Sequence, residues 1–194
     1  MIEAELKARV REPEALRKRL RRLADEERST YRDTYYDRPG RDLTTAGREL
    51  RVRVVEAGEG RRTVLTYKEP AVDAESGSKP EHETDVADAQ TLDSVFRALG
   101  LEHLVAFEKR CANYRFTAHG RGMLATIVTV PELAGMFIEL ETMADEADVS
   151  AALDDVRAVL HELGLNDDDL TTEQYTDAVM SVRGRTEKAP PGRA

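Results

Sequence analysis

The first ten residues, MIEAELKARV, alternate between apolar and charged side chains. Every even position from 2 to 10 is apolar, while the odd positions carry Glu3, Glu5, Lys7 and Arg9. A period of two predicts a β-strand, because successive side chains of a strand point to opposite faces. One face of this strand is therefore apolar, and the other brings two acids and a base together within a few residues.

The same pattern returns on later stretches that also alternate, so it constrains the fold of the whole chain. Glu is a poor strand former, and Thr, Ser or Gln would serve a wet surface equally well, so these charged side chains look selected. The sets that share a face are Glu3, Glu5 and Lys7; Arg51 and Arg53; Thr66 and Lys68; Glu81 and Glu83; and Glu139 and Glu141.

About seven or eight strands are predicted, with short connections that favour antiparallel pairing. They cover residues 1–10, 32–43 (a strand, a Pro-Gly turn and a return), 49–55, 63–70, 81–86, 105–116, 123–130 and 136–143. Amphipathic helices are predicted to begin at residues 12–14 and to cover residues 88–100, 149–163 and 172–182. This order predicts an α+β fold. We expect a single domain over residues 1–183 and a disordered tail over residues 184–194.

Two interpretations of the charged faces are possible. An antiparallel sheet can turn one wet side to solvent, which is common. Alternatively, the sheet closes into a barrel, so that the charged faces converge on its lumen and the apolar faces pack against the helices. Clustered Arg and Lys suit polyphosphate, and clustered Glu suits a hard divalent cation such as Mg²⁺. The recurrence of the pattern favours the barrel, and with it metal-polyphosphate chemistry.

Composition excludes several classes of protein. A net charge of −9 at pH 7 argues against a general nucleic-acid binder, which needs a basic footprint. Cys111 is the single cysteine, so no internal disulfide can form, and a cytoplasmic location is expected. No apolar run approaches the ~20 residues that a membrane helix requires, and no signal peptide is visible. We expect no membrane partner and either a monomer or a homodimer.

Short motifs in a fixed order resemble those of one family. Glu3-Ala4-Glu5-Leu6-Lys7 is similar to the E-x-E-x-K signature that opens the CYTH, or triphosphate tunnel metalloenzyme, superfamily. The resemblance extends to about residue 143, and EQYTDAV (173–179) resembles the end of the class IV adenylyl cyclase branch. The supporting motifs are DTYYD (33–37), LRVR (50–53), LTYK (65–68), EHE (81–83), EK (108–109) and FIELE (137–141).

This resemblance implies a closed, eight-stranded antiparallel tunnel that binds a triphosphate end-on with Mg²⁺ or Mn²⁺. Glu5 would orient the attacking group, and Lys7 would act beside it. The implied metal ligands are Glu3, Glu5, Glu139 and Glu141. The implied substrate-binding residues are Lys7, Arg51, Arg53, Lys68, Lys109, Glu81 and Glu83. Tyr175 could close a tunnel mouth if the last helix folds back, or could serve packing alone.

Two positions depart from the family pattern. Thr129 stands where members usually carry a further acidic metal ligand before the late E-x-E. Members commonly have K-x-R around residue 109, whereas this chain has Lys109, Arg110 and Cys111. A regular strand would turn Cys111 inward and Arg110 outward, while a β-bulge could return Arg110 to the lumen.

Several functions remain compatible with the sequence. Hydrolysis of tripolyphosphate or of an organic triphosphate needs only the phosphate site, so it is the leading hypothesis. Cyclisation of ATP to cyclic AMP and pyrophosphate is the alternative suggested by the branch. Thr129 and Cys111 favour a third possibility, binding of nucleotide or polyphosphate without turnover. A purely structural sheet with solvated charges is the fourth.

Overall fold

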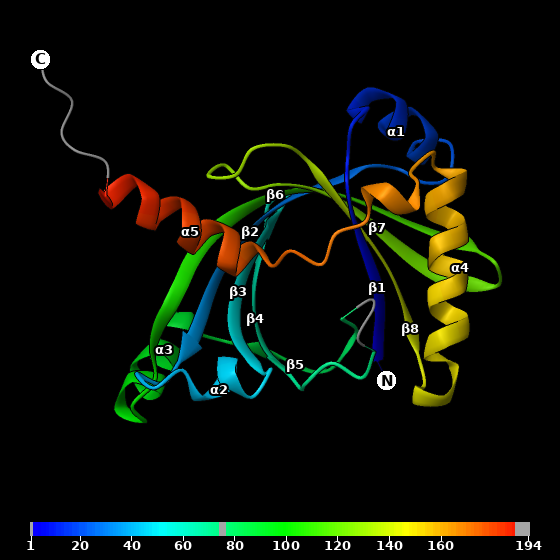
Figure 1. Cartoon of the computed structure of the whole chain (residues 1–194). Coiled ribbons are helices and arrows are strands. Elements are labelled where there is room, and N and C mark those ends of the chain that lie inside the picture. The colour runs from blue at the N-terminus through cyan, green and yellow to red at the C-terminus, as the bar shows by residue number, and fades with distance from the viewer. Residues whose placement is uncertain (1, 74–76, 189–194) are drawn as a thin grey trace, which may run out of the picture.

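A computed structural model of the chain describes residues 2–73 and 77–188. Its centre is a closed antiparallel barrel with the strand order β1-β5-β4-β3-β2-β6-β7-β8 (Figure 1). The barrel, with the helices around it, confirms the predicted α+β tunnel fold. The strands are β1 (Ile2–Arg9), β2 (Glu27–Asp37), β3 (Glu49–Ala57), β4 (Gly60–Lys68), β5 (Lys79–Val86), β6 (Glu102–Ala118), β7 (Arg121–Thr129) and β8 (Phe137–Ala144).

The alternation seen in the sequence decides which side chains enter the barrel. In β1 the even residues from Ile2 to Ala8 are buried on the outer side, beneath helices, and Glu3, Glu5 and Lys7 face the lumen. β8 lies antiparallel to β1, so Glu5 stands opposite Glu141 and Lys7 stands opposite Glu139. The two E-x-E motifs, more than a hundred residues apart in the sequence, therefore meet on one wall.

Helices cover the outer, apolar face of the barrel. α1 and α4 pack over β1, β7 and β8, where Leu6, Leu20, Tyr114 and Leu160 belong to the main hydrophobic core. α3 covers β2 and β3 and places the Phe96 ring 4.9 Å from that of Tyr36. The helices are α1 (Pro13–Leu20), α2 (Asp42–Thr45), α3 (Ala89–Ala98), α4 (Val149–Glu162) and α5 (Tyr175–Lys188), with short 3₁₀ turns η1 (Glu146–Asp148) and η2 (Asp167–Asp169).

The ends of α3 show how local sequence fixes an element. Asp88 precedes the helix, and its carboxylate accepts hydrogen bonds from the backbone N–H groups of Gln90 and Thr91. These bonds satisfy donors that a helix otherwise leaves free at its first turn. Gly100 follows the helix with φ of 80°, a left-handed conformation that glycine adopts without steric cost.

The predicted return strand after the Pro-Gly turn is wrong, because α2 occupies residues 42–45. The cause is Asp37, whose buried carboxylate accepts hydrogen bonds from the backbone N–H groups of Arg38, Leu43 and Thr44. These bonds wrap the chain around one side chain, and strand pairing resumes at β3.

The C-terminal helix is longer than predicted. α5 continues to Lys188, past the predicted start of the disordered tail at residue 184, and residues 189–194 of that tail lie outside the described residues. None of the helices described is both long and apolar enough to cross a membrane.

Candidate functional site

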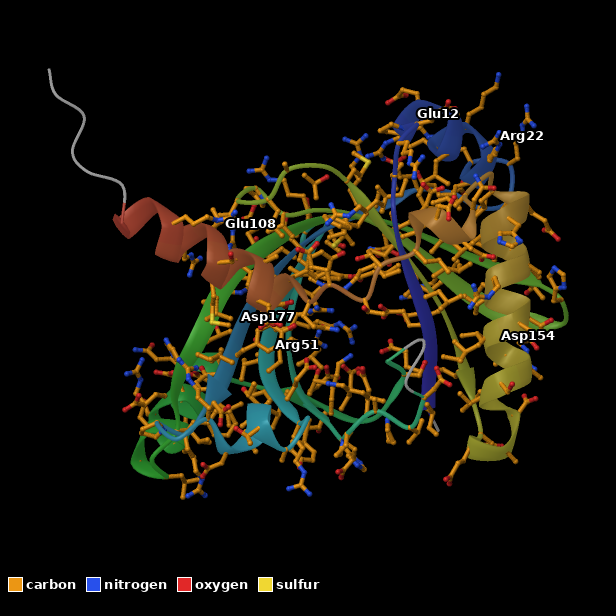
Figure 2. The ribbon with its side chains drawn as sticks, in the orientation of Figure 1. Glu12, Arg22, Arg51, Glu108, Asp154 and Asp177 are labelled. Atoms are coloured by element: carbon orange, nitrogen blue, oxygen red, sulfur yellow. The ribbon has the colours of Figure 1, made fainter. Side chains whose placement is uncertain are left out.

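The barrel encloses a cavity of about 390 Å³ whose walls are mostly polar. Figure 2 shows side chains projecting into this interior, with Arg51 labelled among them, whereas Asp154 lies on the outer helix α4. The structure brings every residue of the predicted site to this one cavity. These residues are Glu3, Glu5, Lys7, Arg51, Arg53, Lys68, Glu81, Glu83, Lys109, Glu139 and Glu141.

An acidic cluster lies where β1 meets β8. Glu3, Glu5 and Glu141 each offer a carboxylate oxygen, and these three atoms lie within 4.8 Å of one another. Burial, together with the charges of Glu139 and Glu3, raises the pKa of Glu5 to about 7. Burial and the neighbouring Glu3 and Glu5 raise the pKa of Glu141 well above its ordinary range. Carboxylates held this close repel one another, and a hard divalent cation would relieve that repulsion.

Glu139, also predicted as a metal ligand, has a different partner in this structure. Its carboxylate lies 3.2 Å from the ammonium group of Lys109. Burial alone would raise the pKa of Glu139, but Lys109, Lys7 and Arg53 together lower it. Glu139 therefore stays ionised and links the acidic cluster to the basic side of the cavity.

Lys68 links β1 and β5 by an ion pair with a glutamate of each strand. Its ammonium group forms ion pairs with Glu3 of β1, at 3.4 Å, and with Glu81 of β5. Burial would raise the pKa of Glu3, but the Lys68 charge and hydrogen bonds from neighbouring carboxyls hold it well below its ordinary range. Burial and the hydrogen bond with Glu3 instead raise the pKa of Glu81 to about 8.

The predicted arginines lie on β3 and are already oriented. Arg53 donates two hydrogen bonds to the buried carboxylate of Asp33, at 2.6 and 2.7 Å, and its guanidinium group lies over the Tyr31 ring. Arg51 donates to the Thr66 hydroxyl at 3.0 Å and lies 3.6 Å from Glu83. Because their conformations are fixed, little side-chain entropy is lost when they bind an anion.

The cavity also contains charged residues that the sequence reasoning missed. Most of them continue the alternation of a predicted set by one or more steps, so extending the pattern would have found them. Glu49 precedes Arg51 on the inner face of β3, and Lys79 precedes Glu81 on that of β5. Arg115 follows Lys109 at an even spacing on β6. Arg62 precedes Thr66 and Lys68 at an even spacing on β4, and the buried Asp33 binds Arg53 from behind the lining.

The structure corrects the position assigned to Thr129. β7 pairs with β8 so that Thr126 stands opposite Glu139, and Thr126 lines the cavity. Thr129 pairs with Arg110 instead, on the outer side of the barrel. Thr126 rather than Thr129 faces the cavity because of the register between β7 and β8, and that register cannot be read from distances along the sequence. β7 still turns no carboxylate into the cavity.

The β-bulge that could have returned Arg110 to the lumen does not form. The β2–β6 ladder is regular past this point, with its register shift at Tyr35/Tyr36. Arg110 is exposed and pairs with Glu108, whereas Cys111 is buried on the inner side. Burial raises the pKa of Cys111 to about 12, so its thiol stays protonated and is a poor nucleophile.

Comparisons with known proteins agree with this geometry. A family model described as "CYTH domain" matches residues 1–175. "Putative adenylate cyclase MJ0240" of Methanocaldococcus jannaschii is 24% identical over 180 residues, which are 91% of this chain and 98% of that protein. The PH1819 protein of Pyrococcus horikoshii superposes with a TM-score of 0.79 at 22% identity, over 92% of this chain and 98% of its own.

A protein from Hippeastrum extends the comparison. Its structure is described as "Putative adenylyl cyclase HpAC1 from Hippeastrum reveals a dominant triphophatase activity". It superposes with a TM-score of 0.63 at 18% identity, over 98% of each chain. At this identity the likeness concerns the fold.

Proposed function

Because the chain belongs to the CYTH domain family, we propose that it is a metal-dependent hydrolase of triphosphates. The substrate would be tripolyphosphate or the triphosphate end of an organic molecule. The observation that carries this proposal is the convergence of Glu3, Glu5 and Glu141 with lysines and arginines in one cavity. The triphosphatase activity named for the Hippeastrum protein supports it.

The residues present fit a divalent cation. Glu3, Glu5 and Glu141 supply the hard oxygen donors that Mg²⁺ and Mn²⁺ prefer, and Glu139 stands next to them on β8. A cation bound there would supply Lewis-acid stabilisation of the charge that develops on the phosphates.

The basic side chains would hold the triphosphate and neutralise its oxygens. Arg51 and Arg53 offer guanidinium groups suited to bidentate contacts, and Lys7, Lys68 and Lys109 act as point charges. Their positions on several strands surround the cavity, so the phosphate chain can be bound along its length. Holding the reacting groups in line is the main task in phosphoryl transfer, because the transition state is loose.

Glu5 is the best placed residue to orient the attacking water. Its carboxylate would accept a hydrogen bond from a water at a cation bound to this cluster and so orient that water for attack. It lies in the acidic cluster, close to where the phosphates would bind.

Cyclisation of ATP is a second candidate, favoured by one feature of the cavity. Apolar side chains line it beside the charged groups, among them Val55, Leu124 and Met143, and Met143 is 49% exposed. Leu124 pairs with Glu141 of the acidic cluster, so an organic group could rest here with its triphosphate next to the acids. The name of the Methanocaldococcus relative points the same way.

One experiment separates the candidates. We would incubate the purified protein with Mg²⁺ or Mn²⁺ and either tripolyphosphate or ATP, and resolve phosphate, pyrophosphate and cyclic AMP. Phosphate release that Glu5→Gln abolishes supports the hydrolase, whereas cyclic AMP with pyrophosphate supports the cyclase. Binding without any product contradicts both and leaves a tunnel that only binds.

Glu56→Gln is a matched control for Glu5→Gln. Glu56 is also a strand glutamate, but it pairs with Arg32 on the outer side of the barrel. We expect this variant to keep wild-type activity. If both variants lose activity equally, the loss reflects damage to the barrel and Glu5 has no special role.

A further inference from the structure

The segment between η2 and α5 crosses one end of the barrel (Figure 1). Its start pairs with β1, because Leu170 forms a β-bridge with Ala8 and the Thr171 N–H donates to the Lys7 carbonyl at 2.9 Å. Further on, the Lys7 ammonium group donates to the carbonyl of Glu173. The segment is thus attached to the strand that supplies the acidic cluster.

Tyr175, the first residue of α5, lies inside this barrel end. It is only 6% exposed, and its ring lies against Phe137, with the centroids 5.3 Å apart. The Lys7 ammonium nitrogen lies 4.6 Å from the centroid of the Tyr175 ring, and that of Lys109 lies 4.2 Å from it. One aromatic ring therefore contacts two of the cations that would bind phosphate.

This arrangement needs an explanation, because two ammonium groups near one ring repel each other. The Glu139 carboxylate offsets part of the charge of both lysines, and Lys7 also donates to the Glu173 carbonyl, but of the two ammonium groups only that of Lys109 forms an ion pair with Glu139 among the described contacts. The negative face of an aromatic ring attracts a cation within about 6 Å, and more strongly where water is excluded. Tyr175 supplies this attraction to both lysines in a buried setting.

We propose that Tyr175 is a positioning residue of the triphosphate site, whose ring holds the ammonium groups of Lys7 and Lys109 for phosphate binding. The proposal rests on the proposed function for the identity of the ligand. It adds that the C-terminal segment is a working part of the site, which the eight strands alone do not complete.

The test measures the Kd of tripolyphosphate by titration calorimetry of the full chain, with a chelator present so that the proposed metal-dependent hydrolysis does not consume the ligand. Tyr175→Leu removes the aromatic face, and we expect Kd to rise about tenfold or more. Tyr175→Phe keeps the ring, and we expect Kd within about twofold of wild type. If Tyr175 only filled space, Tyr175→Leu and Tyr175→Phe would bind tripolyphosphate with the same Kd once their thermal stabilities were equal.

A double-mutant cycle with Lys109→Met shows whether Tyr175 acts through the lysine. We expect Tyr175→Leu to raise Kd by a clearly smaller factor in the Lys109→Met background than in the wild type, because one of its two partners is gone. Equal factors in both backgrounds, or an unchanged Kd in Tyr175→Leu, would overturn the proposal.

Tyr36→Leu is the matched control. Tyr36 is equally buried and packs against Phe96 on the outer side of the barrel. It should lower the melting temperature and leave Kd unchanged.

The outcome also distinguishes this proposal from the proposed hydrolase. If the wild type binds tripolyphosphate in a Tyr175-dependent way but releases no phosphate, the positioning role stands and the hydrolase fails. If the wild type binds neither tripolyphosphate nor ATP, both are wrong.

Discussion

At the level of single residues, Glu3 and Glu5 show how strongly position decides chemistry. They are two positions apart on β1 and both face the cavity, yet their pKa values move in opposite directions. Burial raises both, but Glu3 has the Lys68 ammonium group at 3.4 Å, while Glu5 has the charges of Glu139 and Glu3 around it. The sequence motif E-x-E contains two identical residues, and only their neighbours give them different protonation.

These raised pKa values predict that the metal-free protein loses stability as the pH rises. Glu5 titrates at about 7 and Glu81 at about 8 in the fold, against an ordinary value of 4.5. A raised pKa means that the fold favours the protonated form. The resulting stabilisation is complete below 4.5 and is lost as the pH rises through the folded values. We expect the free energy of unfolding to fall by roughly 1–3 kcal/mol between pH 5 and pH 8.5, measured with urea in the presence of a chelator.

Mg²⁺ or Mn²⁺ should reverse this loss, because it binds the ionised carboxylates. The rise in melting temperature on adding metal should therefore be larger at pH 8 than at pH 5. Glu5→Gln should reduce the pH dependence, since the amide does not titrate. If the free energy of unfolding of the wild type did not change with pH in the presence of a chelator, the fold would not favour the protonated form of these carboxylates. Glu3 and Asp33 have lowered pKa values, so their contribution is lost only in acid, below this range.

At the level of elements, β6 places neighbouring cations on opposite sides of the barrel wall. Lys109 is 5% exposed and faces the cavity, whereas Arg110 is exposed and pairs with Glu108. The absence of a bulge at this point keeps the two apart. The charge of a residue on such a strand therefore says little about its function. Whether its side chain faces the cavity or the outer surface decides its role.

This contrast predicts different effects for two adjacent substitutions. Lys109→Met should lower kcat/KM for tripolyphosphate by roughly ten- to a hundredfold, because a charged hydrogen bond to the substrate is lost. Arg110→Met should leave kcat/KM within about twofold of wild type, because exposed ion pairs contribute little. Steady-state phosphate release measures both. Similar losses in the two variants would contradict the assignment of faces.

At the level of the whole molecule, the pairing of β1 with β5, which closes the barrel, is the shortest strand pairing among the described residues. Within the described residues, β1 pairs with β5 through Ile2–Pro80 and Glu3–Lys79, whereas β1 pairs with β8 along its full length. Lys68 strengthens this seam, because its ammonium group contacts acids of both β1 and β5. The integrity of the barrel and the charge balance of the site thus depend on the same side chains.

We therefore expect the barrel to open first at the β1–β5 seam. Hydrogen–deuterium exchange should be faster in β5 and the start of β1 than in β6 and β7, because fewer ladder hydrogen bonds protect the seam. Lys68→Met should speed this exchange further, and Mg²⁺ with tripolyphosphate should slow it. Lys18→Met, on the exposed side of α1, is the control and should change nothing. Exchange that begins in β6 or β7 would refute the weak seam.

The sequence by itself determined most of the strands, the helices over their apolar faces and the larger part of the charged set that lines the cavity. A period of two is a local property, so Glu3, Glu5 and Arg53 could be assigned to one kind of face without a structure. Tertiary structure decided what depends on register and on distant segments: Thr126 rather than Thr129 faces the cavity, Glu139 lies against Lys109, and Tyr175 reaches Lys7. The physical reason is that strand pairing and chain closure place residues by hydrogen-bond register across the barrel, and no local periodicity encodes that register.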